Sequence, residues 1–417
     1  MLVPKVDKLI GIELFATKSS GISGVIRQSV EDFIVEEVLV DGSKAEINKS
    51  NTHQVLGSSP IRNRYLMCVL FKRNWDSFQA IKMIARQLGV STGQIQIAGI
   101  KDAKAITAQH ITIENITIED IQKVNVKDIE IHPIGYVRNK LSSYYLLGNT
   151  FHITIRDVNH SSSVIKKRVA KILEELQETG GVPNFFGHQR FGTVRPITHL
   201  VGKALAKGNF RKAAMLFLAK PSHYEHPESR QTRKQLQITH NFEQALKDFP
   251  KQLHYERSML KHLVKEPDDF IGAFRRLPIK LRELFPQAYQ AYLFNKFLSK
   301  RIENGFPLNR AEVGDYTVSV ERSGLPTPMV HKLVNSGIIK EVNYAIKTGK
   351  MRLAIPLVGF KQHPSRGVQG EIEKQILEEE GVSMESFKIR DMPEISARGE
   401  LRTAITSLND FSLNQIS

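Results

Sequence analysis

Hydrophobic and polar positions follow two different periods up to Gly180, and these periods predict short strands and two long helices. Two-residue alternation, or a short apolar run, predicts strands at residues 33–38, 65–71, 95–100, 110–114 and 151–156. Helical spacing predicts two helices that end at glycines, at residues 78–88 and 165–176. Because strands and helices do not alternate as regular βαβ units, we expect an α+β fold.

The second half of the chain is predicted to be richer in helix. Residues 286–298 have helical spacing. One face of that helix, which is more typical of a core than of a ligand site, carries Tyr289, Tyr292, Leu293 and Phe297. Residues 308–360 contain short extended pieces separated by Gly and Pro turns. Residues 371–380 form a predicted acidic helix whose charges we expect to be solvated.

An acidic residue follows the predicted strand at residues 95–100. Asp102 lies between Lys101 and Lys104, just after a glycine at position 99 that lets the backbone pass close to another group. The sequence suits a polar turn, because Asp tolerates turn geometry. An acid in a loop at a strand end is also where a rigid scaffold presents a reactive group. Both interpretations stay open on these residues alone.

A second unusual segment follows the glycines that end the helix at residues 165–176. Residues 184–192 read Asn-Phe-Phe-Gly-His-Gln-Arg-Phe-Gly, with three aromatic rings among several hydrogen-bonding side chains. One interpretation is a loop that packs its rings into the core. The other is a platform on which an extruded base stacks, with stacking contributing about 1–3 kcal/mol per base, while polar groups contact base edges or phosphates.

Composition favours an anionic partner. The chain has 417 residues, which suggests two or three domains, and 59 Lys and Arg against 43 Asp and Glu give a net charge of +16. Such an excess attracts polyanions, of which nucleic acid is the commonest. Residues 203–234 contain eight Lys and Arg against two acids. The sequence has no apolar run near the ~18 residues of a membrane span, so we expect no membrane association.

Several chemistries lack their sequence signals. Cys68 is the only cysteine, which excludes an internal disulfide and a multi-cysteine metal site. The histidines do not cluster at metal-ligand spacing, and the glycine-rich phosphate loops and the nucleophile elbow of serine hydrolases do not occur. We therefore expect no metal and no nucleotide cofactor. The N-terminus has no signal-peptide layout, so we expect a cytoplasmic protein.

Four stretches, in chain order, resemble the TruD family of tRNA pseudouridine synthases. They are residues 24–37 with Glu-Asp-Phe and Val-Glu-Glu, the Gly-Ile-Lys-Asp loop at 99–102 through Thr107 and Gln109, residues 184–192, and the helix at 289–301. The resemblance implies a pseudouridine-synthase catalytic core, a mostly antiparallel sheet with flanking helices, at residues 1–208 and 390–417. An α+β TRUD domain at residues 209–389 is expected as an insertion, with RNA bound between the two.

The resemblance also implies a reaction that needs no cofactor. Isomerisation of a uridine in tRNA, with position 13 as the default target, breaks the N-glycosidic bond, turns the base and rejoins it through carbon five. Asp102 is the implied nucleophile, and a cation such as Lys101 or Arg27 would help to keep its carboxylate ionised. The target base must first be flipped out of the folded RNA. The expected partner is tRNA, and the protein is expected to act as a monomer.

The expected contacts fall into two groups. Phe186 matches the phenylalanine of the family's Asn-x-Phe-Gly motif and is expected to stack on the flipped base, while Asn184 orients Asp102 or the base. The full set of expected substrate contacts is Arg27, Phe33, Lys101, Asn184, Phe186, Gly187, Gln189, Arg190 and Phe191. Further tRNA contacts are expected at Lys104, Lys207, Arg211 and Lys212.

One departure from the family pattern concerns the end of the sequence. The family closes with a Leu-Pro-x-Gly-x-Tyr/Phe-Ala-Thr segment, and residues 398–402 resemble the approach to it, but the sequence ends after Phe411-Ser412-Leu413 with four polar or aliphatic residues. The missing segment would leave one wall of the site incomplete. This keeps an alternative open, a catalytically impaired tRNA-binding protein or tRNA chaperone.

Overall fold

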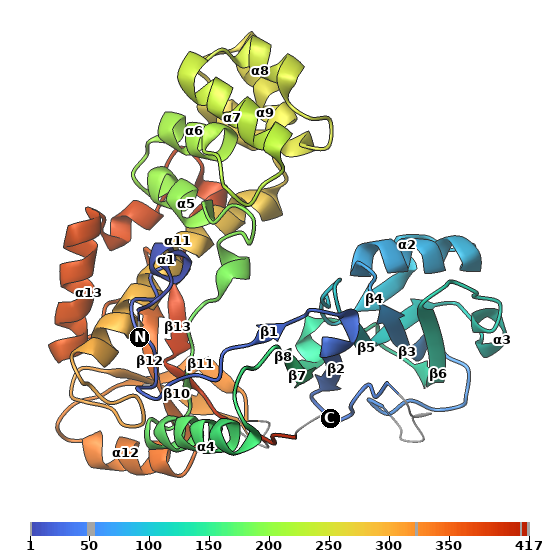
Figure 1. Ribbon diagram of the computed structural model, residues 1–417, viewed down its shortest axis with the longest axis horizontal. Coiled ribbons are helices and arrows are strands. Elements are labelled where there is room, and N and C mark those ends of the chain that lie inside the picture. Colours follow the sequence, from blue (N-terminus) through green and yellow to red (C-terminus); the bar gives the residue numbers. More distant parts are fainter. Residues whose placement is uncertain (1, 48–54, 322–323, 409–410, 415–417) are drawn as a thin grey trace. The chain divides into compact units, whose positions relative to one another are not determined.

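The computed structural model describes residues 2–47, 55–321, 324–408 and 411–414 (Figure 1). The chain divides into two compact units, a smaller one of Gly21–Val169 and a larger one made of Met1–Ser20 and Ala170–Ser417. The boundary at Val169 falls inside helix α4, Ser162–Glu178. None of the helices in the described ranges is long and apolar enough to cross a membrane.

The smaller unit is built on a six-stranded sheet. Its strands lie in the order β6 (Ile129–Val137), β3 (Tyr65–Arg73), β5 (Ile106–Glu114), β2 (Phe33–Leu39) and β7 (Leu146–Ile153), and β4 (Ile95–Ile97) also pairs with β5. All pairs are antiparallel except β2 with β5. A separate ribbon pairs β1 (Val25–Ile26) with β8 (Ile155–Arg156).

Helix α2, Ser77–Leu88, covers one face of this sheet, and a short helix α3 spans Ile118–Ile121. The Asp76 side chain accepts hydrogen bonds from the backbone N–H groups of Phe78 and Gln79, which satisfies two donors at the start of α2. Gly89 ends the helix with a φ of 68°, a conformation that favours glycine. The predicted limits of this helix are confirmed.

The strand register brings three loop positions to one edge of the sheet. Ile34 of β2 pairs with Ile106 of β5, and Arg73 of β3 pairs with the same residue. The segment before β2, the end of β3 and the loop between β4 and β5 therefore meet there. That loop carries Asp102.

The larger unit has a four-stranded antiparallel sheet, in the order β11 (Pro326–Leu333), β10 (Tyr316–Val320), β12 (Met351–Leu357) and β13 (Glu400–Thr403). Helix α11, Ile279–Glu303, packs Leu293, Phe294 and Phe297 against Leu353 and Ile355 of β12. Helices α12 (Ile339–Lys347) and α13 (Gly367–Glu380) belong to the same core. A short ribbon pairs β9 (Val182–Pro183) with β14 (Ile405–Thr406), and α1 spans Lys5–Leu9.

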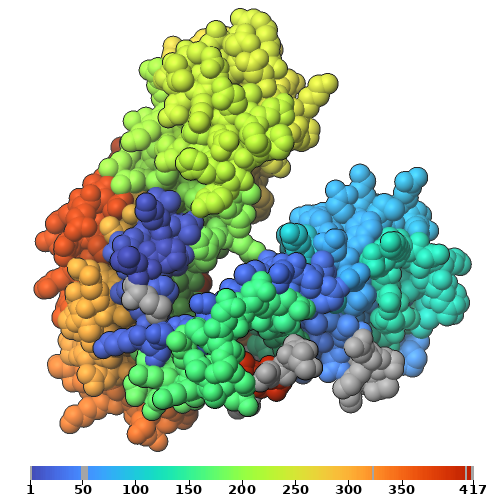
Figure 2. Space-filling model, viewed as in Figure 1, coloured from blue at the N-terminus to red at the C-terminus, as the bar shows by residue number. Residues whose placement is uncertain are grey.

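The remaining helices of this unit form a second core around small and aromatic residues. They are α5 (Thr198–Ala206), α6 (Phe210–Ala219), α7 (Pro227–Thr239), α8 (Phe242–Asp248), α9 (His254–Lys265) and α10 (Phe270–Arg275). Figure 2 shows α6 to α9 as a continuous yellow-green surface at the top of the view.

The α+β class, with mostly antiparallel sheets and flanking helices, is confirmed. Helix α11 begins seven residues before the predicted start, with Pro286 inside it, and α12 was not predicted. The prediction that the acidic helix has a solvated charged face is wrong in part, because Glu373 and Glu380 of α13 are buried. The division into a catalytic part (1–208, 390–417) and an insertion (209–389) stays a prediction, and the compact units divide elsewhere.

Candidate active site

Asp102 is held at the surface of the smaller unit by an ion pair. Arg27 Nη2 donates a hydrogen bond of 2.9 Å to Asp102 Oδ1, and the two side chains are 34% and 22% exposed. The carboxylate is therefore oriented by a cation and still accessible to a ligand. This favours the reactive-group interpretation of the loop over the simple polar turn.

The Arg27 guanidinium lies over the ring of Phe33. This ring is 6% exposed, and the Arg27 guanidinium carbon lies 3.7 Å from the ring centre. Phe151 lies beside the same ring, with centroids 5.8 Å apart. Arg27 also has a φ of 59°, an uncommon backbone conformation for a residue other than glycine. Phe33 therefore packs against Arg27, and its buried ring offers little surface to a substrate.

Lys101 lies beneath the loop rather than beside the Asp102 carboxylate. Its side chain is buried, and Nζ donates a hydrogen bond of 2.5 Å to Oε2 of the equally buried Glu37. Burial alone would raise the pKa of Glu37, but hydrogen bonds from His110 together with Lys101 hold this pKa below its usual value. Because the Lys101 ammonium points into the core toward Glu37, its side chain is not placed for the expected contact with a substrate.

Lys72, at the end of β3, fixes the loop backbone and was missed in the sequence. Its Nζ donates hydrogen bonds to the carbonyl oxygens of Asp102, at 2.8 Å, and of Trp75, at 2.7 Å. Burial lowers the pKa of Lys72 to about 8. Ser77 Oγ adds contacts of 3.1 Å to both backbone groups of Lys101. The sequence signal that could have identified Lys72 is a lysine within an otherwise apolar strand.

Lys104, an expected tRNA contact in the same loop, is exposed.

In the larger unit, the 184–192 segment is fixed by side chains from distant parts of the chain. Asn184 Nδ2 donates to the carbonyl and to Oγ1 of Thr403, both at 3.1 Å. Asn295 of α11 accepts from the backbone N–H of Phe186 and donates to its carbonyl. The Phe186 ring then meets Phe294 edge-on, at 5.6 Å.

Arg402 of β13 covers the Phe186 ring. Its guanidinium carbon lies 3.9 Å from the ring centre, and Nη2 donates a hydrogen bond of 2.7 Å to Asn184 Oδ1. Phe186, Asn184, Arg190 and Arg402 line a hollow of about 580 Å³. The Asn184 amide therefore contacts Thr403 and Arg402 in this structure, and its expected role in orienting Asp102 or the base stays a prediction.

The rest of the segment divides between core and surface. Phe191 is fully buried and packs with Ile10 and Ala288. Its side chain is therefore part of the core and is not accessible for the expected substrate contact. Gly187 and Gln189 are exposed and, with Arg190, line a second hollow of about 680 Å³. Core packing and an accessible platform therefore both describe parts of this segment.

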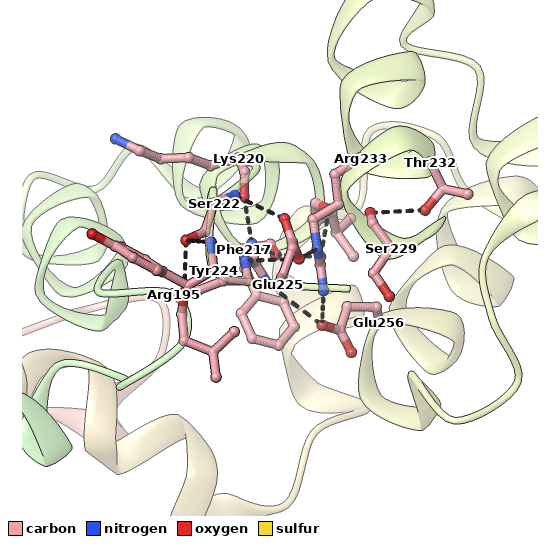
Figure 3. Close-up of polar contacts among 12 residues, drawn as sticks. Arg195, Phe217, Lys220, Ser222, Tyr224, Glu225, Ser229, Thr232, Arg233 and Glu256 are labelled. Atoms are coloured by element: carbon pink, nitrogen blue, oxygen red, sulfur yellow. Dashed lines mark hydrogen bonds and ion pairs between the residues drawn. The ribbon is translucent and has the colours of Figure 1, made fainter. Parts of the chain in front are cut away.

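A buried ionic network anchors the chain just after this segment (Figure 3). Arg233 of α7 donates to Glu225 at 2.9 Å and to Glu256 at 2.6 Å. Arg195 donates to the carbonyl oxygens of Phe217 and Lys220, both at 2.8 Å. These contacts fasten the chain before α5 to helices α6, α7 and α9.

The expected tRNA contacts Lys207, Arg211 and Lys212 lie together at the junction of α5 and α6. All three are exposed. Asn209 accepts from the backbone N–H of Lys212 and caps α6, which fixes the junction.

A third group of polar side chains, His262, Glu266 and Asp269, is close enough to offer ligands to a metal ion. His262 already contacts Asp269 at 2.8 Å, and Asp269 caps the backbone N–H of Gly272. The Arg276 guanidinium lies within 3.3 Å of the other ring nitrogen of His262. A cation in that position opposes metal binding, so the group is explained by local structure.

Comparison with known proteins gives one consistent result. The family model described as "tRNA pseudouridine synthase D (TruD)" matches residues 9–417. Proteins named "Probable tRNA pseudouridine synthase D" are similar, from Methanosarcina mazei at 39% identity, covering 97% of this chain and 89% of the relative, and from Pyrococcus furiosus at 37%, covering 93% and 88%.

A solved structure extends the likeness to the fold. The crystal structure titled as a putative tRNA pseudouridine synthase D from Methanosarcina mazei has a TM-score of 0.85 and 39% identity, and the match covers 98% of this chain and 90% of that chain. Both sequence and fold therefore match one family over nearly the whole chain. The chain belongs to the TruD family of tRNA pseudouridine synthases.

Proposed function

We propose that the protein isomerises a uridine in tRNA to pseudouridine, with Asp102 as the nucleophile. The observation that carries this proposal is the partly exposed Asp102 carboxylate, paired with Arg27 on a loop fixed from beneath by Lys72. Membership of the TruD family supplies the substrate class.

The residues around Asp102 have separate tasks in this mechanism. Attack by the carboxylate makes a transient covalent bond to the nucleotide, and the N-glycosidic bond to N1 breaks. The turned base then bonds to the sugar through carbon five, the bond to Asp102 breaks, carbon five loses its proton and N1 gains one. The reaction is an isomerisation, so atoms and electrons balance without a co-reactant. Arg27, bound to Oδ1, orients the carboxylate and stabilises it again when it leaves.

The aromatic segment of the larger unit supplies further expected contacts to the RNA. Phe186 is the expected stacking partner of the base, and the Arg402 guanidinium lies on one face of the Phe186 ring. Gln189 and Arg190, at the surface of the same segment, are the proposed contacts for base edges or phosphates. Cytoplasmic location, a monomeric state and independence of any cofactor stay predictions.

The target is proposed to be uridine 13, and a mapping experiment tests both target and activity. Unmodified tRNA transcripts are incubated with the purified chain, and pseudouridines are mapped along the RNA. We expect one new pseudouridine at position 13, and none when that uridine is replaced by cytidine. A modification at another position contradicts the target, and tight binding without any product supports the tRNA-binding alternative.

A further inference from the structure

The hollow beside Phe186 has a strongly cationic wall. Its lining includes Arg190, Arg398 and Arg402, with Glu400 as an acid at the same surface. The hollow measures about 580 Å³ and is formed entirely by residues of the larger unit. A space of this size admits a nucleotide portion of an RNA chain.

Arg402 is fixed before any ligand binds. Its backbone is part of the sheet, where it pairs with Ile355. The guanidinium lies on the Phe186 ring at 3.9 Å, Nη2 donates to Asn184 Oδ1 at 2.7 Å, and Nε donates to the Asn184 carbonyl at 3.2 Å. A guanidinium has five N–H donors, so the contacts seen among the described residues use two of them. The other three donors have no partner among the described residues, and Arg402 lines the hollow.

Arg402 contacts two aromatic rings, Phe186 and Phe294, but has no carboxylate as a partner within the described ranges. Burial, and then the nearby charge of Arg190, lower the pKa of Arg402 to about 10, while Glu400 acts weakly in the opposite direction. Within the described ranges, no carboxylate lies at ion-pair distance from the Arg402 guanidinium. A half-buried cation beside a second cation is unfavourable unless an anion binds there.

We propose that the hollow binds a backbone phosphate of the tRNA, with Arg402 as its main ligand and Arg190 as the second. The planar guanidinium fork matches two phosphate oxygens, and its fixed orientation reduces the entropy lost on binding. Phe186 and Asn184 then also position Arg402. This inference rests on the proposed function for the identity of the RNA ligand.

The test is the affinity for tRNA as a function of salt concentration. Removing one phosphate-binding cation lowers the slope of log affinity against log salt by about 0.7–0.9. We expect Arg402→Gln to weaken binding about tenfold at low salt and to lower the slope by that amount. Arg402→Lys keeps the charge without the fork, so it should restore the slope and only part of the affinity.

Two further variants separate this role from a loss of folding. Arg190→Gln removes the second cation, and because Arg190 lies outside β13, the substitution leaves that strand unchanged. This variant should also lower the slope of log affinity against log salt. Arg310→Gln, an exposed arginine of the same unit, is the matched control and should change neither quantity. Thermal unfolding of each variant verifies the fold.

Three outcomes overturn the inference. The first is an unchanged affinity for tRNA and an unchanged salt slope in both Arg402→Gln and Arg190→Gln. The second is weaker tRNA binding by these variants with an unchanged salt slope. The third is a loss of turnover with unchanged tRNA binding, which would indicate that the arginine contacts a neutral base. Pseudouridine formation by the unmodified chain is measured separately. Binding without product would contradict the proposed function alone, whereas absence of tRNA binding would contradict both.

Discussion

Arg27 and Asp102 form an ion pair of 2.9 Å across the edge where β2 and β5 run parallel. The register of these strands brings the two residues together although 75 positions separate them in the chain. The Arg27 guanidinium also lies on the Phe33 ring, which restricts the motion of Arg27 away from the carboxylate. The ion pair therefore positions Asp102.

Replacing Arg27 should impair turnover more than binding. Arg27→Gln removes the charge that orients Asp102, and we expect single-turnover rates to fall about 10- to 100-fold while the Kd for tRNA changes by less than about threefold. Arg27→Lys should recover only part of the rate, because an ammonium cannot lie flat on Phe33. Arg64→Gln removes an exposed ion pair with Glu114 in the same unit and serves as the control. Equal rates in Arg27→Gln and the control would contradict this role.

Lys72 should act on the rate through the Asp102 backbone. Lys72→Met removes the donors to the carbonyl oxygens of Asp102 and Trp75, so the loop loses its fixed position. We expect turnover to fall about tenfold with the Kd unchanged, since a misplaced reactive group affects the chemical step. Lys123→Met, at an exposed lysine of the same unit, should have no effect. Turnover equal to that of the unmodified chain would show that the loop holds its geometry without Lys72.

Glu373 should make the stability of the larger unit depend on pH. Burial raises the pKa of Glu373 to about 7 from 4.5, although Gln369 and the Ser365 backbone donate hydrogen bonds to it. The folded state therefore binds this proton more tightly than the unfolded state, and the free energy of unfolding falls as pH rises from about 4.5 to 7. The full change is roughly 3 kcal/mol.

Denaturant unfolding of Glu373→Gln at pH 5 and pH 8 tests this linkage. Residue 373 of the variant cannot ionise. The free energy of unfolding of the variant minus that of the unmodified chain should therefore be larger at pH 8 than at pH 5, by up to roughly 3 kcal/mol. Glu378→Gln, an exposed glutamate on the same helix, should show no such difference. A constant difference between the two pH values in Glu373→Gln would mean that Glu373 is already ionised in the fold.

The exposed cations at the junction of α5 and α6 should contribute to tRNA binding through charge alone. Replacing Lys207, Arg211 and Lys212 with Gln should weaken the affinity for tRNA and lower the salt slope by up to about 0.7–0.9 for each phosphate that is no longer neutralised. Turnover at saturating tRNA should stay close to that of the unmodified chain.

A matched triple variant distinguishes a local interaction from net charge. Lys340, Lys347 and Lys374 are exposed lysines of the same unit, and replacing them with Gln removes the same total charge. We expect a smaller effect on the slope. If the two triple variants behave alike, the junction makes no specific contact with tRNA.

Local sequence signals predicted the elements that local interactions determine. Helix α2 was predicted with its limits because Asp76 caps its start and Gly89 permits the left-handed end. The extension of α11 before Pro286 and the helix α12 were missed. The extension is fixed by Phe285, which packs against Phe217 of α6, far earlier in the chain, and against Phe274 of α10. Helix α12 does have apolar residues at helical spacing, Ile339, Val342 and Ile346, which pack in the core of the larger sheet, but the Gly and Pro turns around them favoured extended structure in the prediction.

The candidate site was predictable in its residue types and less so in their orientation. Asp102 and Arg27 were named from the sequence, and the parallel pairing of β2 with β5 explains why they meet. The direction of Lys101 depends on Glu37, 64 positions away, and no local pattern reveals it. Arg402 was missed because its role depends on its interactions with Asn184, 218 positions away, and with Phe186.

The central claim is that the Asp102 carboxylate performs the reaction and is dispensable for recognition. Asp102→Asn keeps the size of the side chain and removes its nucleophilic charge. Pseudouridine yield and tRNA affinity are measured together for this variant and the unmodified chain, on the same transcript. We predict that the variant forms no detectable pseudouridine and binds tRNA within a few-fold of the unmodified chain, and a normal yield of pseudouridine from Asp102→Asn would contradict the account.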